Sequence, residues 1–101
     1  MRFGRVEGYV LRVPGSEDEL QLTVTLETGK GIEVVREEVV PVLKPITDQA
    51  LLSWHADQYT QETIGVHLAE AGWEAIGAGD EPEIEANAPA RSLTYGVRNL
   101  G

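Results

Sequence analysis

The stretch LQLTVTLE, residues 20–27, alternates strictly between apolar and polar side chains. Successive side chains of an extended chain point to opposite faces, so a period of two places all the apolar groups on one side. This pattern is typical of a strand with one face in the core and the other in water. The sequence therefore predicts a half-buried β-strand whose inward residues are Leu20, Leu22, Val24 and Leu26.

Strand-like segments flank this stretch on both sides, and clusters of glycine, proline and acidic residues separate them, as turns require. Pro41 cannot donate to a strand ladder, so we expect an edge, a bulge or a break there. Residues 1–44 are thus predicted to form an antiparallel meander of three or four strands. The flanking strands are expected in RVEGYVLRV (5–13) and IEVVREEVVPVL (32–43), and the turns in PGSEDE (14–19) and ETGKG (27–31).

The pattern changes to a helical one at residue 45. Thr47 is the expected cap of a helix that starts near Asp48 and runs to about Tyr59. A second helix is expected from a cap at Thr60 to Gly72, where glycine permits the left-handed backbone that ends helices. Its inward stripe would hold Ile64, Leu68 and Ala71, as Leu51 and Leu52 do in the first helix. The alternation in TIGVHLA (63–69) leaves a strand as the alternative for this segment.

After Gly72 the chain returns to strand-like patterns. WEAIGA (73–78) is a predicted strand, with Trp73 as its core residue. A long acidic loop follows over residues 79–90, with a strand-like segment EIEA (83–86), and RSLTYGVRNL (91–100) is the predicted final strand. The expected fold is therefore a single α+β domain over residues 1–101: an antiparallel sheet packed with one or two helices and a C-terminal hairpin. Its β-rich, helical and C-terminal parts span residues 1–44, 45–72 and 73–101.

Two resemblances bear on this fold. LAEAGWEAIGAGD (68–80) and SLTYGVRNLG (92–101) resemble small bacterial and phage domains of unknown function, in which a helix ends in Gly-Trp-Glu and a hairpin returns through an aromatic and a basic residue. The likeness covers residues 60–101, implies an α+β fold and transfers no catalytic residue; those domains usually have a single N-terminal strand. The rhythm of residues 4–29 is similar to small SH3-like barrels, which gives an architectural alternative. The residues that carry the first likeness are Gly72, Trp73, Glu74, Tyr95 and Arg98.

The net charge of −9 is concentrated in one part of the chain. Residues 45–90 contain nine acidic residues and neither lysine nor arginine, whereas the remainder holds eight of each sign. This region would repel nucleic-acid phosphates and favour a partner protein with a basic surface. The plain alternative is that the acids only keep the protein soluble. We expect no direct nucleic-acid binding.

Composition also limits compartment and chemistry. There is no cysteine, no apolar run long enough to span a membrane and no secretory signal at residues 1–10. We therefore expect a cytoplasmic protein, or a virion component if it is phage-encoded, with no membrane partner.

No catalytic or cofactor motif stands out. Gly77 and Gly79 lack the third glycine and following helix of a phosphate loop, and the acids after them do not have the spacing of a calcium loop. His55 and His67 are twelve residues apart rather than four, and no further zinc ligand can be named. We expect no cofactor and no metal, and interpret the protein as a non-enzyme.

The candidate contact residues are exposed aromatic groups and the densest acidic cluster, because tryptophan and tyrosine anchors dominate protein interfaces. The first hypothesis is a non-catalytic interaction or assembly protein, for instance a phage virion or accessory component, with a basic partner or a second copy. The alternatives are an acidic inhibitor that mimics nucleic acid and a small enzyme using a histidine with a carboxylate. The candidate interaction residues are Trp54, His55, Tyr59, Asp80, Glu81, Glu83, Glu85 and Arg98. Arg91 and Arg98 are expected to pair with the acidic loop within the molecule, and the alternative is that this tail reaches a neighbouring acidic surface.

Overall fold

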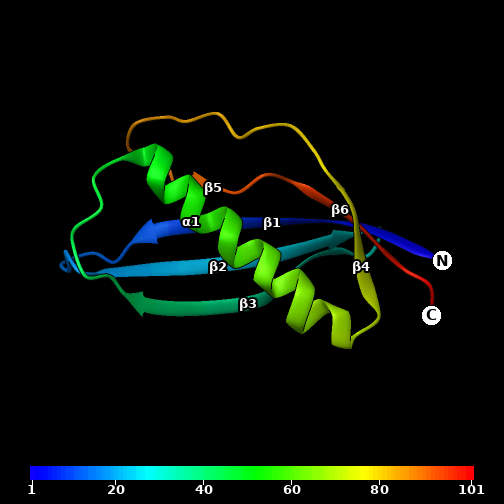
Figure 1. Cartoon of the computed structure of the whole chain (residues 1–101). Helices are drawn as coiled ribbons and strands as arrows, with labels where there is room; N and C mark the ends of the chain where they lie inside the picture. The colour runs from blue at the N-terminus through cyan, green and yellow to red at the C-terminus, as the bar shows by residue number, and fades with distance from the viewer.

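The computed structural model describes residues 1–101 and shows one antiparallel sheet with a single long helix lying obliquely across one of its faces (Figure 1). The strand order is β3-β2-β1-β6-β4, and the short strand β5 pairs with the other end of β1. The sheet is open, with β3 and β4 at its edges, so the barrel-like alternative is not what the chain forms. The strands are β1 (Arg2–Arg12), β2 (Glu19–Thr28), β3 (Gly31–Pro41), β4 (Trp73–Ala78), β5 (Ala90–Arg91) and β6 (Tyr95–Asn99).

The alternating stretch LQLTVTLE (20–27) forms the centre of β2, and its four predicted inward residues are all buried. β1 and β3 flank it in antiparallel register, which confirms the N-terminal meander. Pro41 is the last residue of the edge strand β3, where a missing N–H interrupts no ladder. Together β1 and β2 supply most of the sheet's side of the hydrophobic core.

One continuous helix replaces the two that the sequence predicted. Its first part, α1 (Gln49–Glu62), is capped by Asp48, whose carboxylate accepts a hydrogen bond from the Ala50 amide at 2.9 Å; the prediction of Thr47 as cap was wrong. Beyond α1 the chain forms the π-helical segment η1 (Thr63–Leu68) and stays helical to Glu70.

The predicted cap at Thr60 and the strand alternative for residues 63–69 were therefore both wrong. The reason lies in two buried hydroxyls. Thr60 donates to the Ala56 carbonyl at 2.8 Å and Thr63 to the Tyr59 carbonyl at 2.7 Å. Each threonine thus bonds to its own helix instead of capping a new one.

The helix lies close to the sheet because β1 carries a glycine beneath it. A Cβ built on Gly8 would lie 1.9 Å from Thr60 Oγ1, so no other residue fits at this approach. Leu52, Ile64 and Leu68 are buried as predicted. Ala71 is exposed and Leu51 is 44% exposed, so the predictions for these two were wrong, and Ala56 continues the inward stripe from Leu52.

The C-terminal part follows the prediction with two corrections. β4 has the expected bounds, Gly72 has the expected positive φ of 88°, and Trp73 is buried. Residues 79–89, called here the acidic loop, contain no strand, and the predicted final strand is interrupted between β5 and β6. The interruption has a cause: Ser92 bonds to both backbone groups of Gly8, accepting from its N–H at 2.8 Å and donating its own N–H to its carbonyl at 2.9 Å.

Candidate functional site

Two hollows lie along the flank of the helix that faces β5, β6 and β4. The loop hollow, of about 290 Å³, lies between the start of α1 and the acidic loop. The strand hollow, of about 430 Å³, lies between η1 and the strands β4 and β6. The loop hollow is lined by Ala50, Ser53, Trp54, Asp57, Glu81, Pro82, Ile84, Arg91 and Leu93, and the strand hollow by Gln61, Ile64, Gly65, Ala69, Trp73, Glu74, Ala75 and Tyr95.

Helical spacing aligns the two hollows. Residues three or four apart share one side of a helix, and the lining residues from α1 and η1 follow this spacing from Ala50 to Gly65. The acidic loop passes beside the same flank on its way from β4 to β5 (Figure 1). Its end is fastened to the helix start by Gln49, whose side-chain amide donates to the Ala88 carbonyl at 2.7 Å.

A polar cluster of Asp57, Gln61 and Tyr95 divides the hollows. The Tyr95 hydroxyl donates to Asp57 Oδ1 at 2.6 Å, and the Leu93 amide donates to the same oxygen at 3.2 Å. Gln61 Nε2 donates to Asp57 Oδ2 at 2.7 Å and to the Tyr95 oxygen at 3.1 Å. Asp57 thus accepts three hydrogen bonds but belongs to none of the protein's four ion pairs.

The ionisation of Tyr95 reflects this environment. Burial raises the pKa of Tyr95 to about 12, and the hydrogen bond and charge of Asp57 act in the same direction. A phenol beside an uncompensated carboxylate is held in its neutral form, because ionising it would place two negative charges together. The Tyr95 hydroxyl therefore stays protonated at neutral pH, where it donates to Asp57.

The loop hollow exposes large apolar groups beside acidic ones. Trp54 is 54% exposed and Ile84, from the acidic loop, is 55% exposed. His55 packs edge-on against the Trp54 ring, with 5.0 Å between ring centroids and an interplanar angle of 81°. The hollow thus offers an aromatic wall and an aliphatic wall, and the exposed Glu81 also lines it.

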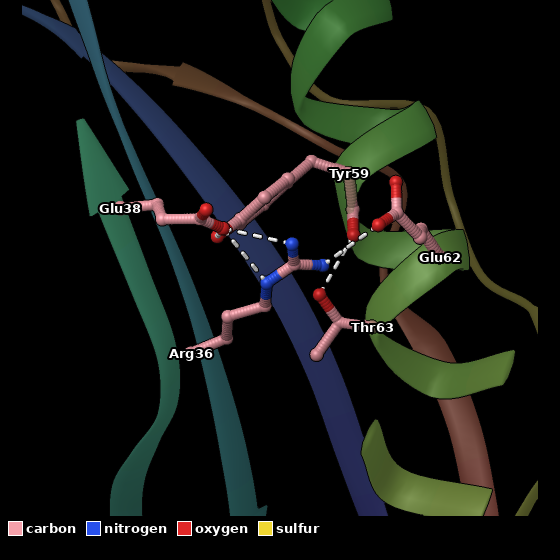
Figure 2. A network of polar contacts seen from close by, with 5 residues as sticks. All are labelled: Arg36, Glu38, Tyr59, Glu62 and Thr63. Atoms are coloured by element: carbon pink, nitrogen blue, oxygen red, sulfur yellow. Dashed lines mark hydrogen bonds and ion pairs between the residues drawn. The ribbon is translucent and has the colours of Figure 1, made fainter. Parts of the chain in front are cut away.

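The opposite flank of the helix, toward β3, is filled by a charged network (Figure 2). Arg36 of β3 pairs with Glu38 at 2.8 Å and with Glu62 of α1 at 3.2 Å, and its guanidinium lies 4.2 Å from the centroid of the Tyr59 ring. The Tyr59 hydroxyl donates to Glu38 Oε2 at 2.7 Å. Here a cation compensates both carboxylates and covers the aromatic ring.

The pKa shifts in this network follow from its contacts. Burial, and then the hydrogen bond to Glu38, raise the pKa of Tyr59 well above its usual value. The same hydrogen bond, followed by the contacts with Arg36, lowers the pKa of Glu38. The network fastens the helix to the edge strand and leaves no hollow among those described.

The structure brings some of the predicted interaction residues together and separates others. Trp54 and Glu81 line the loop hollow, His55 contacts Trp54, and Asp80, Glu83 and Glu85 are exposed on the acidic loop. Tyr59 is buried in the charged network on the other flank. Neither His55 nor the exposed His67 lines either hollow.

The predicted pairing of the acidic loop with the two C-terminal arginines was wrong. Arg98 pairs with Glu74 across the β4–β6 ladder at 2.5 Å, on the side of the sheet away from the helix. Arg91 pairs with Glu7 of the neighbouring strand β1 at 3.5 Å. Both arginines are held by acids of adjacent strands, so no ion pair neutralises the acidic loop.

Sequence reasoning did not identify the dividing cluster. Asp57 and Gln61 are one helical turn apart, a signal that was available, but the expected break near Tyr59 placed them on separate helices. The contact with Tyr95 spans 38 positions and depends on β6 lying next to β1. Such a long-range contact follows from strand order and leaves no local pattern.

The remaining surfaces offer less. The sheet face away from the helix mixes exposed apolar residues, such as Phe3, Ile32 and Val34, with charged ones, as antiparallel sheets with a wet face do. No group of three or more histidine, cysteine, aspartate or glutamate side chains is arranged to hold a metal ion. No helix is both long and apolar enough to span a membrane.

No protein-family model matches the chain, nor does any curated protein or solved structure.

Proposed function

We propose that the protein is a non-catalytic interaction or assembly module that binds a partner protein at the loop hollow. The partner contributes an apolar side chain flanked by lysine or arginine. The observation that carries this proposal is the exposure of Trp54, at 54%, beside a hollow whose acidic residues are left without ion pairs.

The apolar part of the proposal rests on the walls of the hollow. An exposed tryptophan beside a concave surface is the side chain most often found at the energetic centre of an interface. Ile84 and Leu93 face the same hollow, so an inserted side chain meets apolar groups from both the acidic loop and the segment before β6. Burial of such groups supplies most of the affinity in interfaces of this kind.

The basic part rests on charge. Asp80, Glu81, Glu83 and Glu85 are exposed on the acidic loop and form no ion pair. Uncompensated charges at the rim of an interface steer an oppositely charged partner and set the salt dependence of association. A second copy of this chain, with a net charge of −9, is the less favoured partner for this face.

A peptide-display selection against the purified protein tests the proposal with a defined probe. Selected peptides should carry a large apolar residue next to lysine or arginine, and Trp54→Ala should weaken their binding at least about tenfold. The matched control is Val66→Ala, which truncates another exposed apolar residue of the helix that lines neither hollow. Selection of acidic peptides, or equal binding by wild type and Trp54→Ala, would contradict the proposal.

The unpaired acids of the loop also favour a second candidate, an acidic inhibitor that covers the basic groove of a nuclease. A surface of carboxylates can occupy a groove built for phosphates, and such complexes weaken with salt. A panel of basic nucleases would be assayed with wild type and with a variant carrying amides at positions 80, 81, 83 and 85. Inhibition that this variant loses, and that Trp54→Ala keeps, would select the inhibitor over the interaction module. Absence of inhibition across the panel would contradict it.

A further inference from the structure

We propose that the strand hollow is a separate binding site for a small primary amine with an apolar body. This site lies beyond the dividing cluster and shares no lining residue with the loop hollow. Its chemistry therefore does not depend on the protein partner proposed above.

The apolar lining of the strand hollow determines which kind of ligand body fits. Ile64, Trp73 and Ala75 face the hollow from the helix and from β4, and its volume of about 430 Å³ lies within the range of small-molecule sites. Trp73 is buried within the core, so its ring is a rigid wall rather than a mobile lid. An aromatic or branched aliphatic group fits this lining.

The position of the hollow coincides with the π-helical segment. The wider turn of η1 supplies Ile64 and Gly65 to the lining, and single π-helical turns are often found at functional sites. A Cβ built on Gly65 would meet nothing within 4 Å. The space beside Gly65 is therefore open, and a larger side chain there would occupy the hollow without striking the fold.

The polar group of the ligand follows from the hydrogen atoms of the dividing cluster. Gln61 directs both hydrogens of its side-chain amide at Asp57 and Tyr95, and Tyr95 directs its only hydroxyl hydrogen at Asp57. The amide orientation is fixed by chemistry, because a carboxylate can only accept. Gln61 Oε1 is left without a protein partner, so the cluster presents an acceptor and no donor to the hollow.

Charge makes the required donor a cation. None of the residues that line the strand hollow is basic, and its one acidic residue, Glu74, is paired with Arg98. Behind Gln61 and Tyr95 lies Asp57, which no cation compensates. An ammonium group gives Gln61 Oε1 a donor and lies in the field of the Asp57 carboxylate, whereas a carboxylate ligand would meet an acceptor and like charge.

Three compounds with one phenylethyl body test the assignment: 2-phenylethylamine, 2-phenylethanol and 3-phenylpropionate, which are cationic, neutral and anionic at pH 7. They are titrated into Trp54→Phe, whose only tryptophan is Trp73 in the hollow wall. Trp73 fluorescence and backbone amide shifts near Gly65 and Ala75 report binding. The amine should bind about tenfold more tightly than the alcohol, and the acid should bind most weakly.

A second test fills the strand hollow with a larger side chain. Gly65→Leu should abolish amine binding while leaving circular dichroism and the midpoint of thermal unfolding close to those of Val66→Leu, which places a leucine at the next position, outside the hollow. Ala69→Leu, from the next helical turn, is the second filling variant in case Gly65→Leu does not fold. Gln61→Leu should remove the preference for the amine over the alcohol.

Three results would overturn the proposal. They are equal or tighter binding of 3-phenylpropionate, retention of amine binding in a folded hollow-filling variant, and the absence of a Trp73 response to all three compounds up to their solubility limits.

Discussion

The two flanks of the helix use the same tyrosine–carboxylate contact with opposite electrostatic outcomes. Toward β3, Tyr59 donates to Glu38 at 2.7 Å, and Arg36 compensates the carboxylate and covers the ring. Toward β6, Tyr95 donates to Asp57 at 2.6 Å, and no cation pairs with this carboxylate. The first flank is closed and the second carries two hollows.

The difference separates attachment from recognition. The closed flank satisfies its charges internally, so it stabilises the position of the helix and presents little to a ligand. On the open flank the Asp57 carboxylate has no paired cation, Gln61 Oε1 has no protein donor, and Trp54 is 54% exposed. Polar and charged groups that are not satisfied within the protein are expected at functional sites.

Substitution of Gly8, which lies beneath the helix, should have the largest effect on stability. Gly8→Val places a side chain where a Cβ alone would lie 1.9 Å from Thr60 Oγ1, so the helix must move away from β1. We expect a loss of about 3 kcal/mol in the free energy of unfolding, measured by urea denaturation. Gly29→Ala, where a Cβ meets nothing within 4 Å, is the control and should change stability by less than about 0.5 kcal/mol. Equal effects would refute the close approach of helix and sheet.

Arg36→Met should break only the closed flank. The change keeps an apolar chain but leaves Glu38 and Glu62 without their cation and uncovers Tyr59. We expect a loss of about 1–2 kcal/mol, kept modest because the carboxylates are half-exposed. If the two flanks are independent, the affinities for peptide and amine at the open flank should stay within about twofold of wild type. A loss of binding without unfolding would show that the flanks are coupled.

The dependence of stability on alkaline pH tests the contact between Tyr95 and Asp57. Tyr95 has a pKa raised to about 12, against about 10 in the unfolded chain. Between these values the folded protein holds a proton that the unfolded chain has released, so stability is complete below about pH 10 and falls as the pH rises toward 12. Tyr95→Phe should flatten this fall. Asp57→Asn should lower the Tyr95 midpoint, measured by tyrosinate absorbance, and an unchanged midpoint would count against the contact.

Trp54→Ala should change stability least, by under about 0.5 kcal/mol, because the side chain is exposed. Circular dichroism and the unfolding midpoint should therefore match those of Val66→Ala. A fall in stability of more than about 1 kcal/mol would mean that Trp54 supports the fold rather than a partner.

The sheet was largely predictable from sequence because its signals are local. The alternation in β2, the turn residues beside it and the glycine that ends the helix each report their own conformation. The helix was misdivided because Thr60 has the chemistry of a cap, and only its burial against Gly8 of β1 shows that it bonds to its own helix. The open sheet likewise depends on which strands become neighbours, which no single segment encodes.

The candidate site was predictable in part. Trp54 and the acids of the loop were identified by residue type and charge, but Tyr59 was grouped with them although it packs on the opposite flank. The rotation of the helix about its axis determines that Tyr59 contacts Arg36 and that Trp54 stays exposed. The Asp57–Gln61–Tyr95 cluster arises the same way, from a strand and a helix distant in the chain.

The division of the helix into an attached flank and a binding flank is tested most directly by an amide chemical-shift map of the ¹⁵N-labelled protein with a peptide from the display selection. We expect the largest shifts at Trp54, Asp57, Glu81 and Leu93, around the loop hollow, and almost none at Arg36. Largest shifts on β3, or on the sheet face that carries Phe3 and Ile32, would contradict it.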